Sequence, residues 1–142
     1  VASQAGRLAA FDAMTGLANW EQPIATTVMP WLAGETLFVV SVTGDLYALR
    51  LSDGALRWRV ALEDAVDDRL KAGYDLPHYL SPFVGAGQVH ILSQKCRLYS
   101  FNADTGEETD EISLRGEMRT APQIANGAVY VLAQNGKLTK LQ

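Results

Sequence analysis

A short sequence pattern recurs along the chain and strongly limits what the chain can fold into. In residues 44–58 a turn glycine opens a strand, a second glycine closes a turn, and a tryptophan follows. Residues 6–20 repeat this pattern, and a fourth copy begins at Gly136. Residues 96–110 repeat it with Cys96 in place of the first glycine and Asp110 in place of the tryptophan. The copies begin at positions 6, 44, 96 and 136, so their spacings are 38, 52 and 40 residues. Repeats of about 40 residues with several short strands indicate propeller blades or β-solenoid coils, and four strands per repeat favour blades.

The repeat divides the 142-residue chain into parts of one all-β domain. We predict a segment of a β-propeller with about two full and two partial four-stranded blades. The parts are a partial blade (1–27), a blade (28–62), an inter-blade insertion (63–79), a blade (80–117) and a partial C-terminal blade (118–142). Because only three strands are predicted in the last part, we expect an upstream segment of a longer protein to supply its fourth strand. The open edges and faces of such a piece favour self-association.

Short apolar runs bounded by turn residues predict where the strands lie. The continuous apolar run at 37–40 predicts a strand that is buried on both faces. The acidic strand predicted at 107–113 is expected to face solvent. The strands predicted for the second blade are Val28–Leu32, Leu37–Ser41, Asp45–Leu51 and Leu56–Ala61.

The insertion at 63–79 interrupts the repeat and accounts for most of the longest spacing. Its acidic residues come first and its basic residues later, which predicts a short exposed helix. Solvated charges near a helix start are the simpler interpretation. The functional alternative is a partner-facing surface, because insertions in repeat folds are frequent binding sites. The residues of this candidate surface are Asp64, Asp67, Asp68 and Arg69.

Composition and charge argue against several classes of function. The net charge of −4 disfavours a nucleic-acid partner, and no apolar run approaches the ~20 residues that cross a membrane. We predict no catalytic, cofactor-binding or metal-binding residues. His78 and His90 are expected to be exposed or hydrogen-bonded, since a metal site needs three or four convergent ligands. The lone Cys96 replaces a turn glycine and is interpreted as a structural residue.

Trp31 is a further candidate for a functional role. It follows Pro30 at a position where the other two repeats have Phe83 and Gln123. We expect core packing for its large ring, and lining of a central channel or of an exposed surface is the alternative.

The second half of each repeat unit resembles a known family. The pattern Ala-Phe-Asp-x-x-Thr-Gly-x-x-x-Trp of residues 10–20, echoed in residues 48–58, is similar to the quinoprotein-type (PQQ-like) propeller repeat. In that family the tryptophan of the outer strand docks against the adjacent blade. The resemblance therefore implies a structural blade-docking role for Trp20 and Trp58. The repeat occurs in enzymes, sensors and scaffolds, so it indicates fold more strongly than function.

A finer resemblance extends over most of the chain. Residues 6–12, 20–22 and 30–34, the acidic insertion, and residues 126–132 are together similar to the C-terminal part of the BamB-like outer-membrane protein assembly factors. This resemblance implies an eight-bladed ring that acts as a non-enzymatic scaffold and binds the barrel-forming subunit of the assembly machinery. It also implies a location at the periplasmic face of the outer membrane of a Gram-negative bacterium. Membrane attachment would come only from an upstream lipid anchor.

Two other classes of function remain open. One is a fragment of a PQQ-dependent dehydrogenase, although that class uses a vicinal cysteine pair and this chain has only Cys96. The other is the ligand-sensing propeller of a signalling protein, which requires a signalling domain elsewhere in the protein. For the favoured scaffold we expect no cofactor.

Overall fold

The computed structural model describes residues 6–62, 79–114, 122–125, 128–132 and 136–141. These residues form strands joined by turns, and no helix occurs among them. The expected all-β class is therefore confirmed for the described part of the chain. The chain divides into two units, Val1–Pro77 and His78–Gln142, each of which contains two antiparallel sheets.

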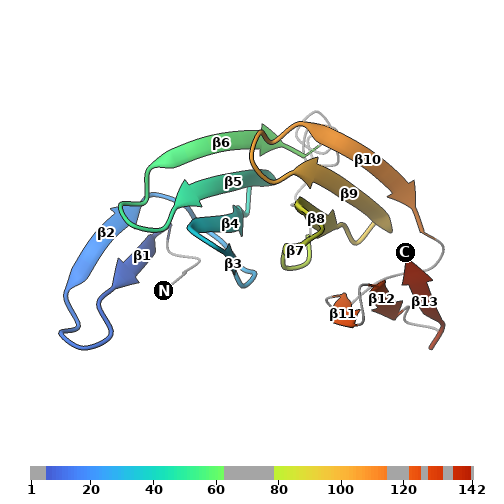
Figure 1. Cartoon of the computed structure of the whole chain (residues 1–142), viewed down its shortest axis with the longest axis horizontal. Coiled ribbons are helices and arrows are strands. Elements are labelled where there is room, and N and C mark those ends of the chain that lie inside the picture. The colour runs from blue at the N-terminus through green and yellow to red at the C-terminus, as the bar shows by residue number, and fades with distance from the viewer. Residues whose placement is uncertain (1–5, 63–78, 115–121, 126–127, 133–135, 142) are drawn as a thin grey trace. The chain divides into compact units, whose positions relative to one another are not determined.

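The first unit consists of a two-stranded hairpin and a four-stranded sheet (Figure 1). The strands of the sheet follow one another in sequence order, so each pairs with the next along the chain. The hairpin contains β1 (Leu8–Phe11) and β2 (Ala18–Gln22), and the sheet contains β3 (Trp31–Ala33), β4 (Thr36–Val40), β5 (Asp45–Arg50) and β6 (Leu56–Ala61).

The second unit repeats this plan with a four-stranded and a three-stranded sheet. Both sheets again keep the strands in sequence order. The first sheet contains β7 (Phe83–Gly85), β8 (Gln88–Leu92), β9 (Arg97–Asn102) and β10 (Glu108–Ser113), and the second contains β11 (Gln123–Ala125), β12 (Ala128–Leu132) and β13 (Leu138–Leu141).

The first strand of the 31–61 sheet lies later in the chain than predicted. A strand was expected at Val28–Leu32, whereas β3 spans Trp31–Ala33. The backbone N–H of Val28 donates a hydrogen bond to Thr26 Oγ1 at 3.2 Å, and Pro30 has no N–H to donate. A hydrogen bond to the nearby threonine side chain thus takes the place of the first inter-strand hydrogen bonds that were expected. Threonine hydroxyls commonly bond the backbone in this way in turns.

The hairpin turns of the repeat share one backbone geometry. The N–H groups of Gly16, Gly54 and Gly106 each donate to the carbonyl four residues earlier, at 2.8–2.9 Å. All three glycines have positive φ angles, which glycine adopts without a steric penalty. At the turn between β8 and β9, Cys96 adopts a left-handed φ of 62°. The interpretation of Cys96 as a turn residue in the place of a glycine is confirmed.

Apolar side chains between neighbouring sheets form the core of each unit. In the first unit one buried cluster joins both sheets, and in the second unit another does the same. Phe38, Val39 and Val40 are all buried, which confirms the strand expected to be covered on both faces. The acidic strand β10 is exposed along its length except at the half-buried Ile112, as predicted. The clusters consist of Leu8, Ile24, Val39 and Leu49 in the first unit and Phe83, Leu92, Leu98 and Val131 in the second.

Candidate functional site

Trp20 of β2 lies on the turn between β5 and β6 of the neighbouring sheet. Its Nε1 donates a hydrogen bond to the carbonyl oxygen of Leu51 at 2.7 Å. The ring covers Gly54, where a Cβ atom would lie 2.6 Å from two ring carbons. Two residues further along β2, Gln22 Nε2 donates to the carbonyl oxygen of Gly54 at 2.8 Å. The indole and the amide together satisfy two turn carbonyls that would otherwise depend on water.

Trp58 occupies the same repeat position on β6. Its ring contacts Phe38 of its own sheet, with ring centroids 5.8 Å apart and the planes tilted by 46°. Tilted aromatic pairs at this separation are favourable. The blade-docking role expected for Trp20 and Trp58 stays a prediction about stability. Substitutions at the residues that these two rings contact can test it.

The acidic surface predicted from Asp64, Asp67, Asp68 and Arg69 lies outside the described residues, and so does His78. The expected helix at 63–79 falls in the same gap, apart from Tyr79. Tyr79 is described and forms an isolated antiparallel bridge with Ser93. The partner-facing role of the insertion therefore stays a prediction.

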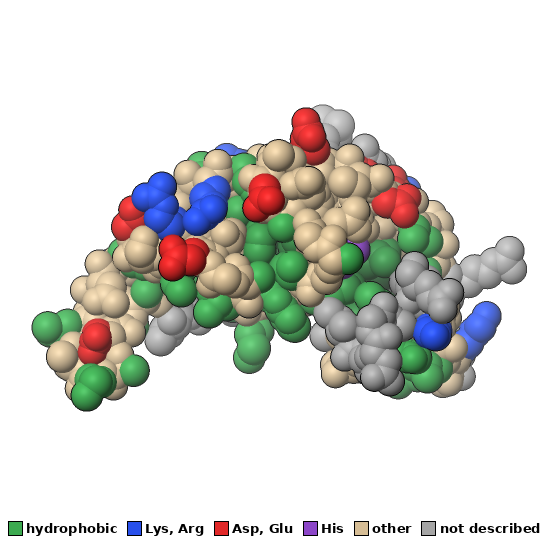
Figure 2. Space-filling view, viewed as in Figure 1, with side chains coloured by type: hydrophobic (Ala, Val, Ile, Leu, Met, Phe, Trp, Pro, Cys, Tyr) green, Lys and Arg blue, Asp and Glu red, His purple; other side chains and the backbone are tan. Residues whose placement is uncertain are grey.

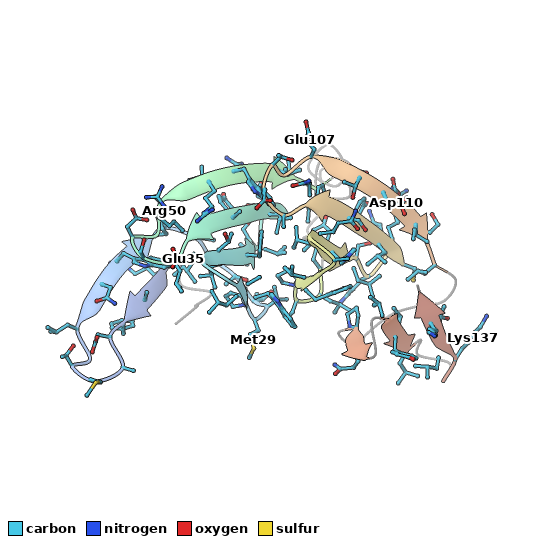
Figure 3. The ribbon with its side chains drawn as sticks, viewed as in Figure 1. Met29, Glu35, Arg50, Glu107, Asp110 and Lys137 are labelled. Carbon is cyan, nitrogen blue, oxygen red and sulfur yellow. The ribbon has the colours of Figure 1, made fainter. Side chains whose placement is uncertain are left out.

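A group of large apolar side chains is exposed around β3. We call Met29, Trp31 and Leu32 the β3 rim; all three are exposed. β3 has three residues and is an edge strand of its sheet. Figure 3 shows Met29 pointing away from the ribbon. The core packing expected for Trp31 is wrong, because its ring is exposed. The equivalent Phe83 lies on an equally short edge strand, β7, but is buried in a cluster that includes Val131 of the next sheet.

The β3 rim has the composition of a protein-binding surface. Tryptophan and methionine are enriched in protein–protein interfaces, where their large side chains bury much apolar area. In Figure 2 hydrophobic side chains gather on the β3 side of the first unit, and charged side chains gather over β5 and β6. Met29 and Leu32 were missed by sequence reasoning. The signal was present, since both flank Pro30 and Trp31 just before a glycine turn.

A buried carboxylate organises the turn that opens β5. Asp45 is buried, and its Oδ1 accepts a hydrogen bond from Arg59 Nη2 at 3.1 Å. Its Oδ2 accepts from Thr43 Oγ1 at 2.8 Å. The guanidinium of Arg59 also lies 5.5 Å from the ring centroid of Tyr47, a favourable cation–π distance. The hydrogen bond to Asp45, and then the charge of Asp45, raise the pKa of Arg59. The ion pair connects Asp45 of β5 to Arg59 of β6. Half of the Arg59 side chain faces solvent, so its positive charge is partly exposed.

His90 in β8 is held by neighbours of its own sheet. Its Nδ1 shares a hydrogen bond with Ser100 Oγ at 2.8 Å, and its ring stacks on Phe83 with centroids 4.9 Å apart. Burial lowers the pKa of His90, with a smaller opposing effect from a hydrogen bond to the backbone of Gly85. The expectation that His90 is hydrogen-bonded is confirmed.

Neither a metal-binding group nor a membrane-spanning helix occurs in the part of the chain that the structure describes. Among the described residues, no group of three histidine, cysteine, aspartate or glutamate side chains is arranged to hold a metal ion. Nor does any helix long and apolar enough to cross a bilayer occur in that part of the chain. What the described residues do present is an apolar rim at β3 and charged outer strands, an arrangement suited to contact with another protein.

Comparison with known proteins finds similar proteins that match along the whole chain. The sequence profile described as outer membrane protein assembly factor BamB matches residues 1–60 and 53–142, and so covers the whole chain. The outer membrane protein assembly factor BamB of Moranella endobia (strain PCIT) is 29% identical over 155 residues. That alignment covers 99% of this chain and 38% of the relative, so the chain spans well under half of the relative's length.

Solved structures confirm the fold. The crystal structure of BamB from Moraxella catarrhalis superposes with a TM-score of 0.73 at 21% identity, covering 97% of this chain and 40% of that one. The propeller class predicted from the repeat is therefore confirmed. The quinohemoprotein alcohol dehydrogenase ADHIIG from Pseudomonas putida HK5 superposes with a TM-score of 0.59 at 23% identity, covering 73% of this chain and 16% of that one. At such identities the two structures bear on fold alone.

Proposed function

The chain belongs to the family of outer membrane protein assembly factor BamB, and from that membership we propose that it acts in outer-membrane protein assembly as a non-enzymatic scaffold. The observation that carries the proposal is the family match, which extends from residue 1 to residue 142. The proposed location is the periplasmic face of the outer membrane. Attachment through a lipid anchor elsewhere in the protein belongs to the same proposal.

The proposed partner is the barrel-forming subunit of the assembly machinery, and the proposed contact is the β3 rim. Three considerations support the rim. Its side chains are large and apolar, Trp31 and Leu32 lie on an edge strand, and Phe83, the equivalent of Trp31 in the next repeat, is buried rather than exposed. Burying an exposed tryptophan or methionine on binding removes apolar surface from water, at about 25 cal/mol per Å². The segment with Asp64, Asp67, Asp68 and Arg69 is proposed as a second, electrostatic contact.

The test is co-purification of the chain with the barrel-forming subunit, comparing substitutions at the rim with one elsewhere. Met29→Glu and Trp31→Glu are each expected to weaken the association at least about tenfold, because a carboxylate would be desolvated in an apolar contact. Leu56→Glu is the matched control, since Leu56 is also exposed but lies on the outer strand β6. Association that survives both rim substitutions, or that Leu56→Glu weakens equally, contradicts the proposed contact.

The role itself has a separate test. If the wild-type chain does not associate with the barrel-forming subunit at all, the proposed partner is wrong. A PQQ-dependent dehydrogenase fragment is the alternative from another class, and the likeness to the quinohemoprotein dehydrogenase supports only its fold. Added quinone and calcium would then produce a bound chromophore and dye reduction, which the scaffold proposal does not expect.

A further inference from the structure

One ion pair recurs at the same place in three repeats. Its first member follows the turn position that opens an inner strand (β1, β5 or β9), and its second member follows the tryptophan position on the outer strand (β2, β6 or β10). In each ladder the second member lies opposite the residue two positions after the first, at Ala9, Tyr47 and Tyr99. The N–O distances are 3.6 Å for Arg7–Glu21, 3.1 Å for Asp45–Arg59 and 3.3 Å for Arg97–Glu111.

The middle pair has the opposite polarity. In the first and third pairs an arginine precedes a glutamate along the chain, whereas Asp45 precedes Arg59. At this position β6 therefore carries a positive charge, while β2 and β10 carry a negative one. The middle pair also contains the most buried member. The side chain of Asp45 is 2% exposed, whereas those of Arg7 and Arg97 are 76% and 38% exposed.

Exchange of outer strands between neighbouring repeats would bring like charges together. If β5 paired with β2 or β10 in the native register, Asp45 would meet a glutamate. If β6 paired with β1 or β9, Arg59 would meet an arginine. Like charges across a ladder are destabilising, and a buried carboxylate that has lost its partner is more costly still. All four exchanges between neighbours are penalised, and only exchange between the first and third repeats, which are not neighbours along the chain, keeps opposite charges together.

We propose that the reversed polarity of the Asp45–Arg59 pair directs each outer strand to its own repeat as the chain folds. The repeats share their turn geometry, since Gly16, Gly54 and Gly106 close their turns with the same hydrogen bond. Similar repeats in one chain are prone to misassembly, and charge contrast gives pairing specificity by penalising the wrong partner. An exposed ion pair contributes little to native stability, so the first and third pairs act mainly on this choice of partner. The proposal does not depend on the proposed scaffold role.

The test reverses one exposed pair so that two neighbouring repeats share a polarity. Arg7→Glu combined with Glu21→Arg keeps an ion pair between β1 and β2 but gives it the polarity of the middle pair. Arg7→Lys combined with Glu21→Asp is the matched control, because it changes the same side chains and keeps their polarity. The measurement is the fraction of chains recovered in the native form after dilution from urea, separated by size-exclusion chromatography. We expect the reversed variant to recover at most about half as much as the wild type, and the control to recover as the wild type does.

Equilibrium unfolding in urea separates the choice of partner from native stability. Arg7 and Glu21 are both exposed, so the urea midpoint is expected to be the same in the wild type, the reversed variant and the control. Lower recovery at an unchanged midpoint is the expected result. Equal recovery of the wild type and the reversed variant overturns the proposal, and so does an equal loss in the control or a loss that a lower midpoint accompanies. Arg97→Glu combined with Glu111→Arg repeats the test at the other neighbour and is expected to lower recovery in the same way.

Discussion

The indole ring of Trp20 covers Gly54 so closely that a Cβ atom at Gly54 would lie 2.6 Å from both Cδ2 and Cε3 of the ring. Gly54 also has a φ of +71°, a backbone conformation that residues with a Cβ atom rarely adopt. Two independent constraints therefore select glycine at this turn. One comes from the backbone of the turn itself, and the other comes from a side chain 34 residues earlier in the chain, as the numbers 20 and 54 show.

Gly54→Ala and Gly16→Ala separate these two constraints. Both glycines close equivalent turns with almost the same φ, but only Gly54 has a neighbour within 4 Å of the added methyl group. We expect Gly16→Ala to lower the free energy of unfolding by about 1 kcal/mol through the left-handed backbone alone. We expect Gly54→Ala to lower it by about 3 kcal/mol, because the Trp20 ring must also move. Urea unfolding followed by tryptophan fluorescence measures both, and equal losses would contradict the docking role of Trp20.

Asp45 provides a second test with an internal control. Asp45 is buried and bonded to Arg59 and Thr43, whereas Asp53 makes a comparable 2.9 Å ion pair with Arg50 on the surface. We expect Asp45→Asn to lower the free energy of unfolding by about 2 kcal/mol, since hydrogen bonds to a buried charged group are lost. Asp53→Asn is expected to leave the urea midpoint unchanged, because exposed ion pairs contribute little. An equal shift of the urea midpoint in Asp53→Asn and Asp45→Asn would show that the burial of Asp45 does not determine its contribution to stability.

The hairpins were predictable from sequence because their constraints are local. Glycines ten residues apart mark turns that need positive φ, and short apolar runs mark the strands. Trp31 illustrates what local information lacks. Its large ring suggested a core residue, but exposure depends on what packs against the face of the sheet. Phe83, on the equally short edge strand β7, is buried because it clusters with residues such as Val131 of the next sheet.

The polar contacts of the candidate site were harder to predict than the strands. Asp45 and Arg59 stand 14 residues apart, and their pairing depends on the β5–β6 register, in which Asp45 lies opposite Ala61 and Tyr47 lies opposite Arg59. The prediction for the start of β3 was wrong for a related reason. The hydroxyl of Thr26 bonds both the N–H of Val28 and the carbonyl of Val40, and no apolar pattern reveals such a contact.

Ala86 at the β7–β8 turn predicts a stabilising substitution. Ala86 has a φ of 52° and is exposed, so its methyl group strains the backbone without contributing to the core. We expect Ala86→Gly to raise the free energy of unfolding by about 1 kcal/mol. Ala13→Gly is the control, because Ala13 is an exposed turn residue that lacks a positive φ, and it is expected to lower stability slightly. Thermal unfolding measures both, and a loss at both positions would contradict the strain at Ala86.

His90 makes the stability of the second unit depend on pH in a defined window. Burial lowers the pKa of folded His90 below the 6.5 of an unperturbed histidine, so the unfolded chain takes up the proton first. The contribution of neutral His90 is therefore complete above about pH 6.5 and is lost as the pH falls towards the lowered pKa. We expect a lower urea midpoint at about pH 5 than at about pH 7.5. His90→Gln is expected to flatten this dependence, because its amide can still bond Ser100 Oγ, 2.8 Å from Nδ1 in the wild type, but does not titrate. An unchanged pH dependence in His90→Gln would assign the effect to another group.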